Sequence, residues 1–344
     1  MGVNLRNLLV RREVSVAELA GRTIAFDAYN TLFQFLSSIR APDGQLLTNS
    51  KGAVTSHLIG LFSRVSKLLE EGVRPVFVFD GEHPKLKHVE IARRAQVKSQ
   101  AQEKYEAALS VGDEGEMRKY AARTTRLTQE MVESAKVLLR LLGVPVVQAP
   151  SEGEAQAAHV VKQGKAWAVA SQDYDSLLYA TPLLVRNLSI AGKRKRPGTR
   201  QMITVRPEII DLAKTLESLG IVQEQLIWLG MLVGTDYNPG GIKGIGPKKA
   251  LKMVKEFSDP AALFEAAGWD VHCDVRWQDV RECFTALPVI DAPQIALGKI
   301  DVAGLRAFLV GENNFSEERV DRTVERLVKQ GGSKEQRSLN QFFA

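Results

Sequence analysis

Seven acidic residues follow short apolar runs along this chain, in a pattern that favours metal-assisted chemistry. They are Asp27, Asp80, Glu152, Glu154, Asp173, Asp175 and Asp236. Carboxylates held close together repel one another and lose hydration when buried, so such a set is costly without a counter-charge. A divalent cation is the usual compensation. Because the set offers oxygen ligands and no His or Cys, it favours Mg²⁺, with Mn²⁺ as a substitute, over zinc.

The acids also allow a structural interpretation. Ser151-Glu152-Gly153-Glu154 fits a helix capping box, with Ser at the N-cap and Glu at N3. Asp173 fits an N-cap with Asp175 favoured by the helix dipole, and Asp27 and Asp80 taken singly fit turns. Capping needs one acid per helix and gains little from pairs. The joint occurrence therefore favours a site in which two metal ions activate a water and stabilise the leaving oxygen of a phosphodiester.

A sheet must position these acids, and the first half of the chain has an α/β pattern. Amphipathic helices are expected at 55–69 and 128–142, between short apolar strands at 23–27, 75–80, 144–148, 166–171 and 183–187. Strand–helix–strand order predicts a mixed, mainly parallel central sheet flanked by helices. Asp27, Asp80 and Asp173 fall at the carboxyl ends of strands, where such sheets bind ligands.

The overall charge favours a polyanionic partner. The net charge is +6 and the pI about 9.2 despite the seven clustered acids, so the remaining surface is more basic than the total implies. This favours nucleic acid. No run of 18 or more apolar residues occurs, so we expect no membrane partner. Cys273 and Cys283 match neither a zinc spacing nor a disulfide framework.

Residues 84–127 have a composition of their own. Ten basic residues outnumber six acidic ones, large apolar residues are sparse, and Gly112 and Gly115 interrupt the helix-forming run. Such a segment cannot bury a full apolar stripe on the core. We expect a solvent-facing helical insertion that supplies phosphate-binding cations near the metals. A solvated charged hairpin with no role is the alternative.

A second motif, G-I-K-G-I-G-P-K-K-A, covers residues 241–250. Its glycines let a backbone approach a phosphate, and Pro247 suits the first turn of a helix. The free N–H groups at that helix start bind anions, and Lys248 and Lys249 add charge. The pattern resembles a helix-hairpin-helix over about 225–257, which holds duplex DNA by its backbone without reading sequence. A plain glycine-rich loop is the alternative.

The C-terminal part is expected to be mainly helical over 206–330 and a flexible tail over 331–344. A third motif lies in this tail and consists of Gln336, Leu339, Phe342 and Phe343. Its spacing matches the sliding-clamp interaction motif, in which a helical turn presents the three apolar side chains to a pocket of the clamp (PCNA). An accidental match on a disordered tail is the alternative.

Taken together, the motifs resemble those of the xeroderma pigmentosum group G nuclease family, and within it the flap endonucleases, over essentially the whole chain. The matching motifs, in family order, are A-F-D-A, F-V-F-D-G, E-G-E-A, Q-D-Y-D-S-L-L, G-T-D-Y and G-I-G-P-K-K-A. The resemblance implies a Mg²⁺-dependent, structure-specific 5′ flap endonuclease with associated 5′ exonuclease activity, acting in Okazaki-fragment maturation and base excision repair. Another 5′ nuclease of the family, or a non-catalytic DNA-binding replication scaffold, is the alternative.

The resemblance also implies an organisation. It implies one nuclease domain over 1–330, with residues 84–127 forming a helical arch through which a 5′ flap passes. Eukaryotic relatives usually continue past the clamp motif, so we expect an archaeal protein in the cytoplasm, associated with the nucleoid; a eukaryotic one would be nuclear. The implied partners are branched DNA with a 5′ flap and the sliding clamp, with the chain alone a monomer.

Residue roles follow from the same resemblance. One metal ion would lie among Asp27, Asp80, Glu152 and Glu154, and the other would be completed by Asp173, Asp175 and Asp236. Lys87 and Arg94 would reach the scissile phosphate. DNA contacts are implied at Gly2, Phe33, Gly244, Gly246, Lys248 and Lys249, with a K⁺ ion at the helix-hairpin-helix. Phe33 stands where relatives often carry Tyr, so stacking on a base is retained and a hydroxyl hydrogen bond is lost.

Overall fold

A mixed sheet forms the centre of the molecule in the computed structural model, which describes residues 2–342 except 42, 196–201 and 293–294. Within these residues the strand order of the main sheet is β1-β9-β6-β5-β2-β3-β4. Strands β2 to β6 pair in parallel, whereas β9 is antiparallel to β6 and β1 to β9. Their bounds are β1 Arg11–Glu13, β2 Thr23–Asp27, β3 Arg74–Phe79, β4 Val146–Gln148, β5 Ala168–Ala170, β6 Leu183–Arg186 and β9 Glu208–Asp211. The predicted mixed, mainly parallel sheet is confirmed.

Alternation along the central strands divides the core into two parts, one on each face of the sheet. Ala25 of β2 and Val76 of β3 pack into one apolar cluster, and their neighbours Phe26 and Phe77 pack into the other. The two phenylalanine rings stack at 5.0 Å between centroids across the β2–β3 pair. Because both faces are covered, the strands are short continuous apolar runs, which is how they were recognised in the sequence.

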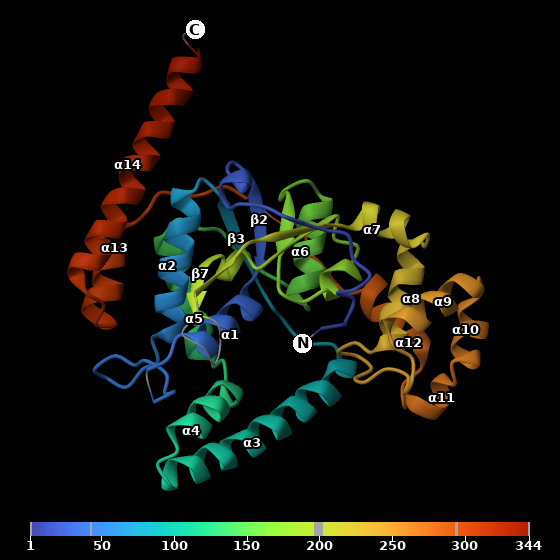
Figure 1. The fold of residues 1–344 in the computed structure, drawn as a ribbon. Helices are drawn as coiled ribbons and strands as arrows, with labels where there is room; N and C mark the ends of the chain where they lie inside the picture. The colour runs from blue at the N-terminus through green and yellow to red at the C-terminus, as the bar shows by residue number, and fades with distance from the viewer. Residues whose placement is uncertain (1, 42, 196–201, 293–294, 343–344) are drawn as a thin grey trace.

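Helices cover both faces (Figure 1). On one face lie α1 Ala28–Ser38, α2 Ser56–Glu70, α5 Gln129–Leu141, α13 Val302–Arg306 and α14 Glu317–Phe342. On the other lie α6 Gly153–Lys162 and a C-terminal group made of α7 Leu212–Leu219, α8 Gln223–Val233, α9 Pro247–Glu256, α10 Pro260–Ala266, α11 Trp269–His272 and α12 Trp277–Thr285. Among the described helices, none alone is long and apolar enough to cross a membrane; α7 and α8 meet that test only together, as a pair bent by 80°.

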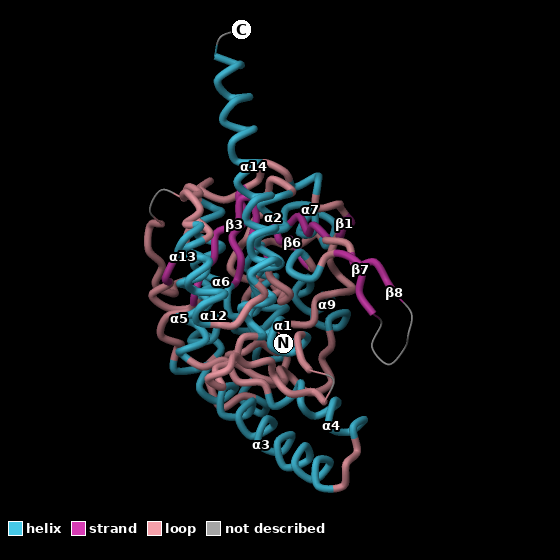
Figure 2. Tube along the Cα trace, turned by 90° about the vertical axis from the view of Figure 1, so that its left-hand side faces the viewer, coloured by secondary structure: helices cyan, strands magenta, loops and turns pink. Residues whose placement is uncertain are grey.

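Two antiparallel elements were not predicted. Strand β1 is exposed along its whole length. Strand β9 is only four residues long and begins directly after Pro207. Neither strand therefore has the apolar run that marks the central strands. A separate hairpin, β7 Gly192–Lys195 with β8 Met202–Val205, also projects from the body (Figure 2). Short strands such as these depend on pairing with a neighbour more than on their own sequence.

The charged segment 84–127 forms a helical arm that extends from the body, as both views show (Figures 1 and 2). It consists of η2 Lys85–Lys87, α3 His88–Ser110, α4 Glu114–Ala121 and η3 Ala122–Thr124. Helix α3 buries only Glu90, Ala101 and Ala108. The helical insertion expected from the sequence is therefore present.

The last helix departs from expectation. We predicted a flexible tail from residue 331, whereas the backbone of α14 stays helical to Phe342 and leads away from the body (Figure 1). Gly331 and Gly332 each cost about 1 kcal/mol in a helix interior, and the Glu, Arg and Lys residues around them are good helix formers. The side chains of Gln336, Leu339 and Phe342, and all of Phe343, lie outside the described residues, so the clamp motif stays a prediction.

Candidate active site

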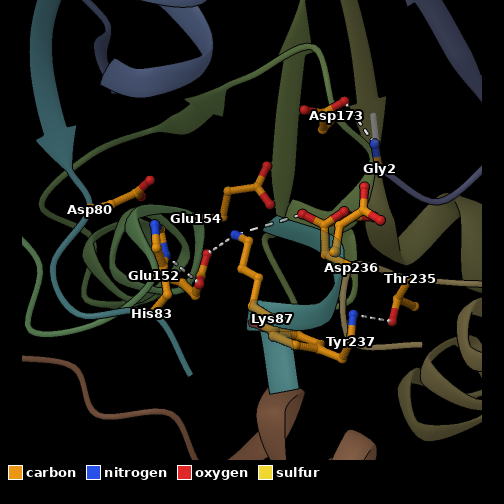
Figure 3. Close-up of polar contacts among 12 residues, drawn as sticks. Gly2, Asp80, His83, Lys87, Glu152, Glu154, Asp173, Thr235, Asp236 and Tyr237 are labelled. Atoms are coloured by element: carbon orange, nitrogen blue, oxygen red, sulfur yellow. Dashed lines mark hydrogen bonds and ion pairs between the residues drawn. The ribbon is translucent and has the colours of Figure 1, made fainter. Parts of the chain in front are cut away.

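The acids predicted from the sequence meet at the carboxyl edge of the sheet. Asp27 is the last residue of β2, Asp80 directly follows β3, and Asp173 and Asp175 lie just beyond β5. The other members come from the start of α6 and from the loop after α8, and are Glu152, Glu154 and Asp236. Figure 3 shows side chains from these segments pointing toward a common space, with the Lys87 ammonium group within it.

Three of these acids, the buried Asp27 and Asp175 and the half-buried Glu154, have neutral partners. Asp27 accepts from the backbone N–H of Asn30 at 3.0 Å. The Ser171 hydroxyl lies between Asp27 Oδ2 at 3.3 Å and Glu154 Oε1 at 3.2 Å. A hydroxyl has one proton to donate, so it serves only one of the two carboxylates at a time. Asp175 accepts from the backbone N–H of Val3 at 2.6 Å.

The pKa values reflect this shortage of positive charge. Burial, followed by the charge of Asp80, raises the pKa of Asp27 to about 7. Burial likewise raises the pKa of Asp175 to about 7. The pKa of Glu154 lies well above its ordinary value because of burial and then of the neighbouring charges of Asp175 and Asp27. Groups of this kind take up either a proton or a metal cation near neutral pH.

The capping box considered for residues 151–154 is wrong. The N-cap of α6 is Glu152, whose side chain makes no capping bond, and the Ser151 hydroxyl donates to the Glu82 carbonyl at 3.0 Å. Instead Asp80 Oδ1 accepts from the Gly153 N–H at 2.7 Å. A Cβ at residue 153 would lie 2.5 Å from that oxygen, so glycine permits the contact. Burial, followed by the charge of Glu152, raises the pKa of Asp80 to about 6.

Cations from the base of the arm neutralise two of the other acids, Glu152 and Asp236. Lys87 Nζ lies 2.5 Å from Glu152 Oε2 and 3.7 Å from Asp236 Oδ2. Arg94 contacts Asp236 Oδ1 at 2.5 Å and is held on its other side by Glu90 at 2.6 Å. The sequence-predicted cations Lys87 and Arg94 thus lie beside the acids in space.

Ionisation is favoured in this part of the site. Burial alone would lower the pKa of Lys87, but the charge of Glu152 outweighs it, and the pKa is raised. Burial alone would raise the pKa of Glu152, but hydrogen bonds from His83 and Lys87 outweigh it, and the pKa is lowered. Near neutral pH Glu152 is therefore an anion, whereas Asp27 and Asp175, with pKa values raised to about 7, are partly protonated.

Several contacting residues were missed in the sequence. His83 Nδ1 lies 3.0 Å from Glu152 Oε1, and Asn30 donates from its side-chain amide to Asp173 Oδ2 at 2.8 Å. Ser176 donates to Glu154 at 3.1 Å. Ser176 lies within the Q-D-Y-D-S-L-L motif, which was the signal that could have identified it. His83 and Asn30 are single polar residues outside the quoted motifs, so the sequence contains no signal that separates them from ordinary loop or helix residues.

The N-terminal segment closes one side of the site (Figure 3). The Gly2 N–H donates to Asp173 Oδ1 at 3.1 Å. A Cβ at residue 2 would lie 2.5 Å from the Asp175 carboxylate, so a larger residue would have to displace that side chain. Gly2 is therefore close to the acids, as the sequence resemblance implied.

The glycine-rich motif forms the connection between α8 and α9, which pack against each other. Ile242 and Ile245 are buried and anchor the loop. Its exposed residues are Lys243, Gly244, Gly246, Lys248 and Lys249. This arrangement leaves backbone N–H groups and ammonium groups free to meet a phosphate.

Phe33 lies on α1, away from this loop. It is half-buried and packs under Lys98 Nζ at 5.0 Å from the ring centroid. The contact links a side chain of α1 to one of α3.

The donor set fits divalent metal ions, although their ligands are not yet arranged around one point. No three His, Cys, Asp or Glu side chains in the described part of the chain stand together at coordinating distances. The Lys87 ammonium group lies between Glu152 and Asp236 instead. The chemistry of the donors supports metal binding: they are hard oxygen ligands with little exposure to solvent, and the carboxylate charge is left uncompensated at Asp27, Glu154 and Asp175.

Comparison with known proteins agrees with the motifs. The family model described as the XPG N-terminal domain matches residues 1–101, and that described as the XPG I-region matches residues 143–236. Flap endonuclease 1 from Aeropyrum pernix is 49% identical over 332 residues, covering 96% of this chain and 95% of that protein. Flap endonuclease 1 from Pyrococcus furiosus is 48% identical and covers 100% of this chain and 99% of its own.

A solved structure, flap endonuclease-1 from Methanococcus jannaschii, matches with a TM-score of 0.75 at 40% identity, covering 97% of this chain and 100% of that one.

Proposed function

The chain belongs to the XPG nuclease family, and from this premise we propose that it is a structure-specific 5′ flap endonuclease that depends on divalent metal ions. It hydrolyses phosphodiesters where a 5′ single strand meets duplex DNA, as in Okazaki-fragment maturation and base excision repair. The observation that carries the proposal is the convergence of buried, uncompensated carboxylates with Lys87 and Arg94 at one edge of the sheet.

In this proposal the carboxylates bind the metal ions and the cations of the arm contact the substrate. Two divalent ions, Mg²⁺ or Mn²⁺, would supply an activated water and stabilisation of the leaving oxygen. The seven carboxylates would hold them, with Gly153 and Asn30 orienting Asp80 and Asp173. Lys87 and Arg94 are in ion-pair contact with Glu152 and Asp236 and project from the arm, so they can turn toward a scissile phosphate without moving the sheet.

The arm and the α8–α9 loop serve opposite ends of the substrate. The arm would guide the 5′ single strand, with Phe33 stacking on a base beside the cut. The loop with Gly244, Gly246, Lys248 and Lys249 would hold the duplex by its phosphates, together with a K⁺ ion. This grip requires duplex binding that weakens with salt and ignores sequence.

Other parts of the proposal rest on the sequence and on the archaeal relatives. Residues 336–343 would bind the sliding clamp (PCNA), and the chain alone would be a monomer. Its location would be the cytoplasm, in association with the nucleoid.

A cleavage assay tests the function. A 5′-flap substrate labelled on the flap is incubated with and without Mg²⁺, beside a blunt duplex and a 3′ flap. We expect Mg²⁺-dependent cleavage at the junction of the 5′ flap alone, and no cleavage by Asp173→Ala, which should still bind flap DNA. Binding of the flap in Mg²⁺ without cleavage would instead identify a non-catalytic scaffold.

A further inference from the structure

His83 stands in the loop that follows β3, between Asp80 and the arm. Its side chain points into the site and approaches Glu152 from the side opposite Lys87 (Figure 3). His83 Nδ1 lies 3.0 Å from Glu152 Oε1, while Lys87 Nζ lies 2.5 Å from Oε2. The two oxygens of Glu152 therefore have different partners, each from the segment that leads from the sheet into the arm.

The hydrogen bond has a definite direction. An ionised carboxylate can only accept, so the proton lies on His83 Nδ1. Such charge-assisted bonds are stronger than neutral ones. Glu152 is 4% exposed, so water cannot readily replace a lost donor. The Glu152 side chain also makes no capping bond to α6, which leaves His83 and Lys87 as the partners that orient it among the described contacts.

The two partners differ in how firmly they are held. Lys87 is a long, flexible side chain with a second anion, Asp236, at 3.7 Å, and the proposed mechanism requires it to turn toward the substrate phosphate. The His83 side chain is shorter, and when Lys87 turns away from Glu152 the His83 ring remains as its partner. Histidine–carboxylate contacts of this kind orient the oxygens that bind a metal ion.

We propose that His83 is a positioning residue of the metal centre, whose Nδ1–H fixes Glu152 through Oε1 and leaves Oε2 facing the cation. This inference rests on the proposed metal-dependent function. It gives the residue a role while Lys87 is engaged with substrate, because Glu152 then depends on His83 alone for its orientation. Loss of such an outer contact costs about 10–100-fold in metal affinity.

Three substitutions separate this role from others. In His83→Asn the side-chain Nδ2 stands at the same distance from the backbone as the histidine Nδ1, so the donor is kept without an aromatic ring or a titrating group. His83→Gln moves the amide one carbon further out, and His83→Ala removes the donor. His272→Ala, at an exposed histidine on α11, is the matched control.

The readout is Mn²⁺ binding to the metal-free protein, followed by electron paramagnetic resonance of the free ion. We expect the wild type, His272→Ala and His83→Asn to agree within about threefold, and His83→Ala and His83→Gln to weaken one site by about 10–100-fold. Circular dichroism reports folding. If the Ala variant unfolds, the Asn and Gln variants, which differ by one methylene, still decide the question.

The outcomes are distinguishable. Equal Mn²⁺ affinity in the wild type and His83→Gln overturns the inference and leaves the proposed function intact. His83→Asn as weak as His83→Ala also overturns it, because the donor position would then not matter. A wild type that binds no Mn²⁺ overturns the proposed function, and the inference with it.

Discussion

The two halves of the acid cluster are neutralised in different ways. Glu152 and Asp236 face cations of the arm, each at 2.5 Å. The other five acids accept hydrogen bonds only from neutral groups in the contacts made by described residues, and they are Asp27, Asp80, Glu154, Asp173 and Asp175. We call Glu152 and Asp236 the paired half, because cations of the protein already balance their charge. We call the other acids the uncompensated half, because they need a proton or a metal ion to balance their charge. The difference indicates that the uncompensated half has the greater need of a metal ion, while the cations of the paired half, Lys87 and Arg94, are available to a substrate phosphate.

The largest effect is expected in the uncompensated half. Glu154→Gln keeps the shape of the side chain but removes a charge that would bind metal. Loss of several kcal/mol of transition-state stabilisation corresponds to about 10³-fold in the cleavage rate. Because the charge is also a source of repulsion, the metal-free variant should be more stable than the wild type near pH 8. Single-turnover cleavage and thermal unfolding measure the two effects; a less stable variant would show that Glu154 is compensated after all.

A smaller loss is expected in the paired half. Lys87→Met removes the cation that bridges Glu152 and Asp236, and we expect single-turnover cleavage to slow by about 10²-fold because a charge at the phosphate is lost. Lys85→Met, at an exposed lysine two residues earlier, is the matched control and should cleave normally. If both variants cleave alike, the arm does not act on the phosphate through Lys87.

The stability of the metal-free protein should fall as the pH rises. Burial raises the pKa of Asp27 and Asp175 to about 7 and of Asp80 to about 6, all above the ordinary value of 3.8. Groups with a raised folded-state pKa contribute stability that is present below about pH 4 and is lost as the pH passes through 6 to 7. The lowered pKa of Glu152 acts in the opposite sense, but only below its ordinary value of 4.5.

Thermal unfolding at about pH 5 and about pH 8 tests this. We expect the metal-free midpoint to be lower at the higher pH by several degrees, since about 1 kcal/mol corresponds to roughly 2–4 °C in a domain of 150–250 residues. Mg²⁺ should restore the midpoint at about pH 8 and change it little at about pH 5. A midpoint that rises with pH and ignores Mg²⁺ would mean that the acids carry no excess charge.

The smallest effect is expected far from both halves. Deleting residues 336–344 should leave basal flap cleavage and Mg²⁺ dependence unchanged, because α14 leads away from the sheet (Figure 1). It should abolish stimulation by the sliding clamp. A pull-down with the clamp and a cleavage assay with and without it provide the measurement; undiminished clamp binding would refute the role of the tail.

The sequence predicted the residues that belong to a repeated pattern, an apolar strand followed by an acid, and missed most of those that belong to no pattern. Strand ends followed by acids located Asp27, Asp80 and Asp173 because buried parallel strands are continuous apolar runs. The same local reasoning also allowed a capping box at Ser151, which is wrong because α6 has Glu152 at its N-cap and the Ser151 hydroxyl donates to Glu82, while Asp80, distant in sequence, accepts from the Gly153 N–H. Local patterns do not contain such long-range competitors.

Two further misses have the same origin. His83 and Asn30 belong to no spaced motif, and only the fold brings them next to Glu152 and Asp173. Strand β1 has no apolar residue, and it forms because β9 offers an edge to pair with. Properties set by a partner elsewhere in the chain require the assembled structure.

The most direct test of the central claim is to count Mn²⁺ ions bound per chain near neutral pH, in the wild type and in Glu154→Gln. The proposed dinuclear centre predicts about two ions for the wild type, and for the variant either a lost ion or a greatly weakened site. Less than one ion per chain in the wild type, or the same two affinities in both proteins, would contradict the claim that the uncompensated acids hold metal.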